Sequence, residues 1–162
     1  MENARRVTME GTKHTIFQIG DGIYGLDVSD VRTVETYTES KKTGQMPANI
    51  KGVIKAGEEI IPVYSLRKKF NLQDKEPDVE TRLIITRTNN MWLAYEVDKI
   101  LEVVDIGYER RFETPAIFNT KETSYIKRII DYKEQLVIIM EHNKILSEQE
   151  QAEIMYMIKN VL

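Results

Sequence analysis

The sequence contains no cysteine among its 162 residues. This absence excludes thiol catalysis, thiolate metal sites and a disulfide framework, and it fits a reducing compartment. Histidine is nearly absent as well, because only His14 and His142 occur, at opposite ends of the chain and without partners at metal-ligand spacing. We therefore expect no metal site and no cofactor.

Long apolar runs and an excess of positive charge are also missing. The longest clean apolar run is LVIIM, residues 136–140, far short of the ~20 residues that span a bilayer. The 23 Lys and Arg residues are spread among 26 Asp and Glu residues, which gives a net charge of −3. A nucleic-acid-binding protein usually gathers positive charge on one face. We expect no nucleic-acid partner, no insertion into a membrane and a cytoplasmic location.

Motifs of common enzymes are lacking too. No phosphate-binding glycine loop occurs, and no serine lies in a nucleophile elbow. Asp27, Asp98 and Glu102 lie near expected strands, but a single sequence does not show that any two carboxylates converge. We therefore expect no catalytic residue, and a hydrolase with converging carboxylates is the least favoured functional hypothesis.

What the sequence does contain is a series of short alternating strands separated by tight turns. Hairpins are expected around Gly20–Gly22 and around Lys133–Glu134, within a total of nine or ten strands. An S-x-x-E capping box at Ser147 precedes an amphipathic helix at about 147–161. The pattern predicts an all-β fold, a small barrel or sandwich, with one C-terminal helix. We expect a single domain over 1–162, with an N-terminal tail at about 1–13.

Two local features are expected between the first strands and the middle of the chain. Ser29 is expected to cap a short helical turn that carries Val31 and Val34. Pro62 lies inside the apolar run IIPVY and favours an edge strand or a bulge, because proline cannot donate to a central ladder.

A second helical turn is expected directly after that run, in SLRKKF. Leu66 and Phe70 are four positions apart and would anchor the turn on the core. The cations between them, residues 67–69, are expected to project into solvent.

The stretch IKGVIKAGEEIIPVYSLRKKF, residues 50–70, resembles the central signature of the CheW-like family, the coupling proteins of bacterial chemotaxis. That signature runs roughly I-x-G-V-x-N-x-R-G-x-I-x-P-V-x-D-L-R-x-x-F. The matching positions are Ile50, Gly52, Val53, Ile60, Pro62, Val63, Leu66, Arg67 and Phe70. The segments FQIGDGIYGLDVSDVRTV and MWLAYEVDKILEV are similar to other parts of the family pattern and occur in the family order.

The resemblance implies a fold of two intertwined, five-stranded β-barrel subdomains that share a core, followed by a C-terminal helix. It implies a noncatalytic adaptor that couples a CheA-type histidine kinase to the cytoplasmic tip of a chemoreceptor. One barrel would dock the regulatory domain of the kinase, which is itself CheW-like, and the groove between the barrels would take the receptor helical hairpin. The alternative is a module of this fold that serves a signalling system other than chemotaxis.

The same resemblance suggests where partners bind, and the sequence departs from the family there. The N-x-R-G of the signature reads Lys55-Ala56-Gly57-Glu58, so the expected arginine is absent, and the acidic residue usually two positions after Val31 is Thr33. For Gly52, a purely structural role in packing or in a turn is expected as much as a partner contact. The positions at which we expect partner contacts are Val31, Thr33, Val34, Gly52, Lys55, Gly57, Glu58 and Arg67.

Overall fold

The structure is a computed structural model that describes residues 13–160, except 89, 108–110 and 113–119. Most of the expected N-terminal tail, the end of the expected C-terminal helix and much of the loop before residue 122 thus lie outside the described residues. The strands are β1 (Lys13–Ile19), β2 (Gly22–Asp27), β3 (Val31–Thr36), β4 (Ile50–Ala56), β5 (Glu59–Ser65), β6 (Arg82–Thr88), β7 (Met91–Val97), β8 (Lys99–Asp105), β9 (Arg111–Phe112), β10 (Ile126–Tyr132) and β11 (Gln135–Met140). The helices are η1 (Val28–Asp30), α2 (Leu66–Lys69), η4 (His142–Lys144) and α3 (Glu148–Asn160).

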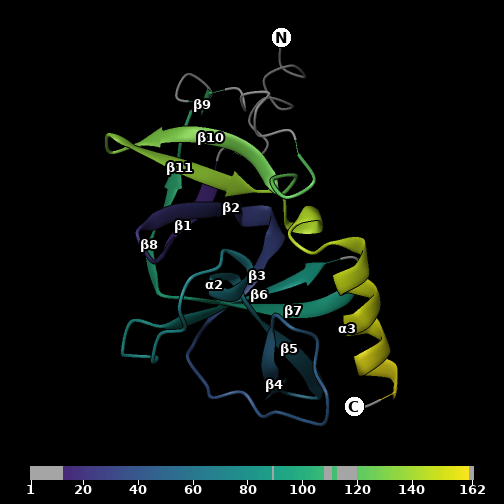
Figure 1. The fold of residues 1–162 in the computed structure, drawn as a ribbon. Coiled ribbons are helices and arrows are strands. Elements are labelled where there is room, and N and C mark those ends of the chain that lie inside the picture. Colours follow the sequence, from purple (N-terminus) through teal and green to yellow (C-terminus); the bar gives the residue numbers. More distant parts are fainter. Residues whose placement is uncertain (1–12, 89, 108–110, 113–119, 161–162) are drawn as a thin grey trace.

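The strands form two sheets, and the chain enters one of them twice. The first sheet has six strands in the order β8-β1-β2-β11-β10-β9, and the second has five in the order β3-β6-β7-β5-β4. The chain begins the first sheet with β1 and β2, builds the whole second sheet, and returns to the first at β8 (Figure 1). The expected all-β class with a C-terminal helix is confirmed.

The closed barrels implied by the resemblance are not formed by the described strands. In neither sheet are the first and the last strand paired with each other, so neither sheet closes into a barrel. In the six-stranded sheet the last strand, β9, has two paired residues, which is too short to close a barrel against β8. The architecture is therefore two open, packed sheets.

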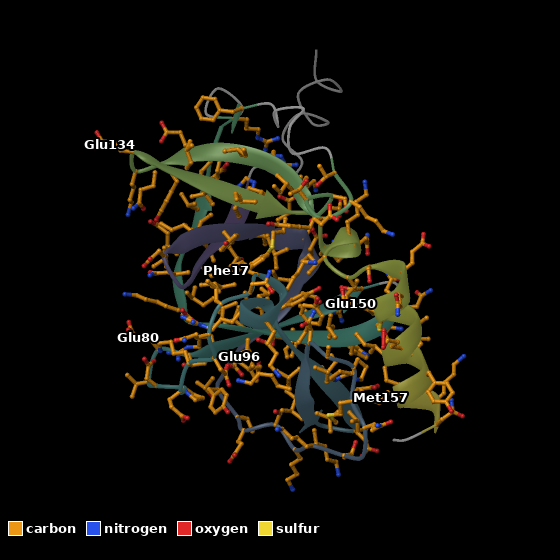
Figure 2. All side chains as sticks on the ribbon, in the orientation of Figure 1. Phe17, Glu80, Glu96, Glu134, Glu150 and Met157 are labelled. Atoms are coloured by element: carbon orange, nitrogen blue, oxygen red, sulfur yellow. The ribbon has the colours of Figure 1, made fainter. Side chains whose placement is uncertain are left out.

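A shared apolar core joins the two sheets, as expected. Its largest cluster combines Phe17 of the six-stranded sheet with Tyr64 and Tyr95 of the five-stranded sheet, all fully buried. Figure 2 shows Phe17 in this region between the sheets. Each sheet also has a smaller cluster of its own, around Ile130 in the first and Val63 in the second. Burial of large side chains from both sheets in one cluster makes the two sheets stabilise each other.

The segment after β2 differs from the expected helical turn. Val28–Asp30 forms a short 3-10 helix without a side-chain cap, and the expected turn residues Val31 and Val34 lie in strand β3. The expectation that Ser29 caps a helical turn is wrong. β-Branched residues favour extended backbone, and antiparallel pairing of β3 with β6 supplies the hydrogen bonds that a single helical turn would have had to make itself.

Pro62 lies in an internal strand, which corrects the expected edge position. β5 lies between β7 and β4, but its pairing with β7 begins only at Val63. Pro62 is paired with Val53 on the β4 side alone. The N–H and C=O of Val53 bond to Lys41 on its other side, so the Val53–Pro62 pair exchanges no hydrogen bonds. The missing proline N–H therefore removes no ladder bond, which is the physical requirement behind the original expectation.

The turn α2 is anchored as the sequence predicts, with one correction. Ser65 caps it, because the Lys68 backbone N–H donates to the Ser65 Oγ at 3.1 Å, and Leu66 is fully buried. Phe70 is half-buried and stacks on Tyr24, with the ring centroids 5.0 Å apart. The expectation that all three cations face solvent is wrong for Arg67, whose guanidinium group binds a carboxylate. It is also wrong for Lys69, which is half-buried and has its Nζ 5.4 Å from the centroid of the Tyr125 ring.

The helix α3 begins at the predicted capping box. The Ser147 N–H donates to Glu150 Oε1, and the Glu150 N–H donates to Ser147 Oγ, both at 3.1 Å. The other oxygen of Glu150 accepts hydrogen bonds from the Tyr64 hydroxyl at 2.7 Å and from Asn49 Nδ2 at 2.8 Å. Figure 2 shows Glu150 and Met157 on α3, and Met157 is buried. The cap therefore also fixes the helix to the five-stranded sheet.

Candidate partner-docking surfaces

The eight residues expected to contact partners do not form one surface. Val31, Thr33 and Val34 lie in β3, whereas Gly52 and Lys55 lie in β4. In the strand order β3-β6-β7-β5-β4 these two strands are the opposite edges of the five-stranded sheet. Any partner contacts at β3 and at β4 therefore belong to two separate places.

The β3 edge is open to solvent. β3 pairs with β6 alone, and every residue from Arg32 to Thr36 is exposed. Val34 keeps 40% of its surface exposed. Val31 is half-buried and packs against the shared core, so its side chain is partly structural. Among the three predicted residues of β3, Val34 is thus the apolar side chain most available to a partner.

Two arginines and a tryptophan lie beside the β3 edge, and the sequence expectations missed them. The guanidinium carbon of Arg32 lies 5.3 Å from the centroid of the Trp92 ring, and that of Arg87 lies 5.1 Å from it. Arg87 and Trp92 are cross-strand partners on β6 and β7. The strand alternation of these segments signals which residues share a face, but not which strands become neighbours.

The β4 edge is partly covered by the chain itself. A loop over residues 37–49 crosses it, and Lys41 and Val53 exchange two backbone hydrogen bonds, both of 2.9 Å. Gly52 is buried beneath this loop, where a Cβ atom would lie 2.7 Å from Ser40 Oγ and 2.8 Å from the Lys41 carbonyl oxygen. Close packing of backbone thus accounts for the glycine, and its contact with a partner stays a prediction.

The turn between β4 and β5 projects from the sheet. Lys55, Gly57 and Glu58 are all exposed there. Gly57 has φ +63°, and no atom lies within 4 Å of the place where a Cβ would be built. The turn therefore selects glycine for backbone conformation, and its surroundings leave room for a partner.

Arg67 is engaged inside the molecule. Its Nε and Nη2 donate to the two oxygens of Asp98 at 3.0 and 2.6 Å, and Nη1 donates to the Gln73 carbonyl oxygen at 2.7 Å. Asp98 also accepts the Gly20 backbone N–H at 2.8 Å, so the pair ties α2 to the turn between β1 and β2. Burial alone would raise the pKa of Asp98, but the hydrogen bonds and charge of Arg67 outweigh burial and lower it. Arg67 thus holds the two sheets together.

An apolar groove opens on the six-stranded sheet, where β2 and β11 share only two paired positions. The groove has a volume of about 320 Å³. Leu136 at its rim is 66% exposed, and Tyr24 at its inner end begins the aromatic stack with Phe70. Its lining consists of Asp21, Gly22, Ile23, Tyr24, Ile126, Ile129, Gln135, Leu136 and Ile138. None of the eight predicted contact residues is among them.

Charged groups hold the 3-10 helix η1, through which the chain passes from the first sheet to the second. Asp27 precedes this helix and binds Lys127 Nζ at 2.6 Å and Arg128 Nη1 at 2.9 Å. At the other end of η1, Asp30 Oδ2 lies 3.2 Å from His142 Nδ1. The interaction with Asp30 raises the pKa of His142, and the nearby carboxylate of Glu141 acts in the same direction, against burial and Lys127. The start of β3 is therefore fixed by charge at both ends of η1.

Within the described part of the chain, no group of three or more His, Cys, Asp or Glu residues is arranged to hold a metal ion. None of the described helices is long and apolar enough to cross a membrane. Among the described residues, the surfaces considered for partners are a strand edge, a projecting turn and an apolar groove. Such features bind proteins through backbone pairing and apolar contact.

Comparison with known proteins gives one family and consistent relatives. The sequence model of the CheW-like domain matches residues 13–150. Chemotaxis protein CheW of Klebsiella aerogenes is 28% identical over 142 residues, which cover 88% of this chain and 86% of the relative. Chemotaxis protein CheW of Bacillus subtilis is 26% identical over 140 residues, which cover 86% of this chain and 89% of the relative.

A solved structure shares the fold. The crystal structure of the scaffolding protein TtCheW from Thermoanaerobacter tengcongensis superposes with a TM-score of 0.77 at 24% sequence identity. The match covers 86% of this chain and 95% of that chain. The arrangement of two sheets and a C-terminal helix is therefore that of a known scaffold.

Proposed function

Since this chain belongs to the CheW-like domain family, we propose that it is a noncatalytic, cytoplasmic adaptor of bacterial chemotaxis that joins a CheA-type histidine kinase to the cytoplasmic tip of a chemoreceptor. The observation that carries the proposal is that the chain has two separate accessible surfaces and that one shared core connects the sheets that bear them. An adaptor needs two partners to be held at once, in a fixed relative position. A core that joins both sheets fixes the two surfaces relative to each other.

The kinase contact is assigned to the β3 edge. This edge has exposed backbone and an exposed apolar side chain, Val34. The resemblance implies that one subdomain docks the CheW-like regulatory domain of the kinase. A free strand edge is suited to a partner that is itself built of strands.

The receptor contact is assigned to the groove lined by Tyr24 and Leu136, which lies on the six-stranded sheet and not between two subdomains as the resemblance implies. Its apolar walls and its length along β2 and β11 suit one face of an amphipathic helix, which binds through apolar side chains at helical spacing. Leu136 at the rim exposes more apolar surface than a strand residue usually does. The receptor tip is a helical hairpin in this family, so its chemistry fits the groove.

The carboxylate-dependent hydrolase considered from the sequence requires two carboxylates that converge in a pocket. The groove is lined by one carboxylate, Asp21, among isoleucine, leucine and tyrosine side chains of the described residues. This composition favours binding of a protein over acid–base chemistry.

The test measures both partners on the same variants by isothermal titration calorimetry. Val34→Glu is expected to weaken binding of the kinase regulatory domain at least about tenfold and to spare the receptor fragment, because a buried charge at an interface costs binding energy. Leu136→Glu is expected to do the reverse. Val103→Glu is the matched control, because Val103 is 60% exposed and lies on β8, which β1 separates from β2 and which belongs to the other sheet from β3.

The two surfaces are wrongly assigned if the control variant fails to bind both partners, or if Val34→Glu and Leu136→Glu each bind both partners as the wild type does. If the wild-type chain binds neither partner, the alternative of a CheW-fold module in another signalling system replaces the proposal.

A further inference from the structure

The outer side of strand β3 is unpaired among the described strands, and it is exposed. On one side β3 is paired with β6, and on its other side no strand of the described chain is paired with it. The residues from Arg32 to Thr36 are all exposed. Such an edge leaves backbone N–H and C=O groups ready to pair with an extended segment of another protein.

A bulge turns one cation toward the neighbouring tryptophan. The register of β3 against β6 shifts between Val31 and Thr33, which makes Arg32 the extra residue. Its guanidinium group and that of Arg87 both lie over Trp92, at 5.3 and 5.1 Å from the ring centroid. Two like charges are thereby held close to one ring, with Arg32 on the edge strand β3 and Arg87 on β6, the strand directly behind it.

These two arginines have no carboxylate within ion-pair distance among the described residues, whereas Arg67 and Arg128 each bind one. Like charges held together repel each other, and a shared carboxylate would relieve that repulsion and could be bound by planar guanidinium groups. The charge along β3 is not uniform, because Glu35 lies further along the strand and accepts a hydrogen bond from the Thr33 hydroxyl at 2.6 Å. A complementary strand therefore needs a carboxylate near Arg32 and none opposite Glu35.

We propose that the β3 edge takes an extended acidic segment of a protein partner by strand addition, with one of its carboxylates bound by Arg32 and Arg87 beside Trp92. The proposal deepens the kinase-docking role given to this edge and rests on it. It also gives a reason for the departure at Thr33: this chain lacks the acidic residue that the family pattern has there, and presents two arginines that require the acid on the partner. A protein strand is favoured over a nucleic acid, because only a peptide backbone can pair with the open strand edge.

The test uses the full chain, labelled with ¹⁵N, and a short peptide in which Glu alternates with Val. The expected result is that the amide signals of β3 shift on addition of this peptide, and that a peptide with Lys in place of Glu gives no such shift. Arg32→Glu and Arg87→Glu are each expected to weaken binding of the Glu peptide at least about tenfold, because each removes a charge-assisted hydrogen bond and adds repulsion. Lys68→Glu, the same charge change on an exposed residue of α2, is the matched control and should bind as the wild type does.

Equal shifts with the Glu and Lys peptides would overturn the proposal, as would shifts confined to the β8 edge. Stronger shifts of the same amides with an oligothymidylate would assign the edge to nucleic acid instead. The failure of this proposal is separable from the failure of the adaptor role. If Val34→Glu abolishes binding of the kinase domain while Arg32→Glu and Arg87→Glu leave it unchanged, the docking edge is correct and the acidic partner strand is wrong.

Discussion

The two edges of the five-stranded sheet differ in what covers them. At the β4 edge, the loop over residues 37–49 pairs with Val53 and closes over Gly52. At the β3 edge, no described strand adds to the sheet, and an apolar side chain and two arginines face solvent. An edge that the chain covers itself is protected from pairing with other proteins, whereas an uncovered edge is available to them. The difference supports the proposal that a partner docks at β3, whereas partner contacts at Gly52 and Lys55 of β4 stay predictions.

The largest change in stability is expected at the covered edge. Gly52→Val should lower the free energy of unfolding by about 1–3 kcal/mol, because the added atoms meet Ser40 and the Lys41 backbone and force the loop outward. Urea unfolding measures the change, and amide hydrogen exchange of Val53 should report the opened loop. If the variant is as stable as the wild type, the loop does not pack on β4 as described.

A smaller loss of stability is expected at Arg67, which helps to join the two sheets. Arg67→Lys should cost about 1–2 kcal/mol, because lysine cannot form the paired hydrogen bonds to Asp98. The lowered pKa of Asp98 contributes stability that is present above its unfolded value and is lost as pH falls through the folded value. The wild type should thus lose more stability than the variant on acidification, as measured by urea unfolding from neutral pH into the acid range. Equal acid sensitivity of the two proteins would contradict this role for Arg67.

At the projecting turn next to the covered edge, substitution of Gly57 should change stability only through the backbone conformation. Gly57→Ala is expected to cost about 1 kcal/mol, because φ is +63° and a Cβ at this angle is strained even in open space. Gly57→Asn is the control, since asparagine tolerates this conformation and should lose less stability. Thermal unfolding of the three proteins in parallel provides the comparison, and equal losses for alanine and asparagine would show that space rather than conformation selects the glycine.

Strand β3 follows directly after η1, and η1 is held in part by the contact between Asp30 and His142. Because histidine titrates near neutral pH, this anchoring should depend on pH. The pKa of His142 is raised in the folded protein, mainly by its hydrogen bond to Asp30. A raised histidine pKa gives stability that is fully present below the unfolded value near 6.5 and is lost as pH rises through the folded value. Unfolding free energies across this window should therefore fall with pH in the wild type, and His142→Gln should remove that part of the slope. An unchanged slope in the variant would assign the dependence to another group.

The smallest change in stability is expected at the free edge itself. Val34→Lys should alter the free energy of unfolding by less than about 0.5 kcal/mol, because this side chain is 40% exposed and belongs to none of the buried clusters. Val31→Lys is the informative partner variant, since Val31 packs against the shared core and should cost clearly more. Urea unfolding of both variants therefore tests whether the edge is as open as its exposure indicates. A loss at Val34 as large as that at Val31 would mean that β3 is covered.

Local patterns predicted many of the elements, because each depends on neighbouring residues. The capping box at Ser147 and the turn residues Lys133 and Glu134, both at positive φ, follow from short-range chemistry. The anchor at Leu66 is also where helical spacing places it. The expectation failed at Ser29, where a capping signal competed with strand pairing to β6, which is more than fifty residues away in the sequence. Local propensity is weak beside such pairing.

The positions of the expected contact residues relative to one another could not be predicted from the sequence. The expected contact residues were drawn from the family signature, and the structure divides them between two edges, a turn and an internal ion pair. The groove along β2 and β11 was not located, because its walls come from strands that are distant in the sequence. The cluster of Trp92 with Arg32 and Arg87 was not located either, since the bulge in β3 that brings Arg32 over the ring leaves no sequence signal.

By itself, the sequence determined the strand-rich class, the capped C-terminal helix, the absence of thiol chemistry and the family likeness, since these depend on composition and on contacts between near neighbours. Only the tertiary structure decided which strands became edges, that Arg67 serves a contact between the sheets, and that Gly52 lies beneath a loop. The physical reason is that exposure belongs to the packed arrangement of the whole chain: a residue is free to meet a partner only after the rest of the molecule has left it uncovered.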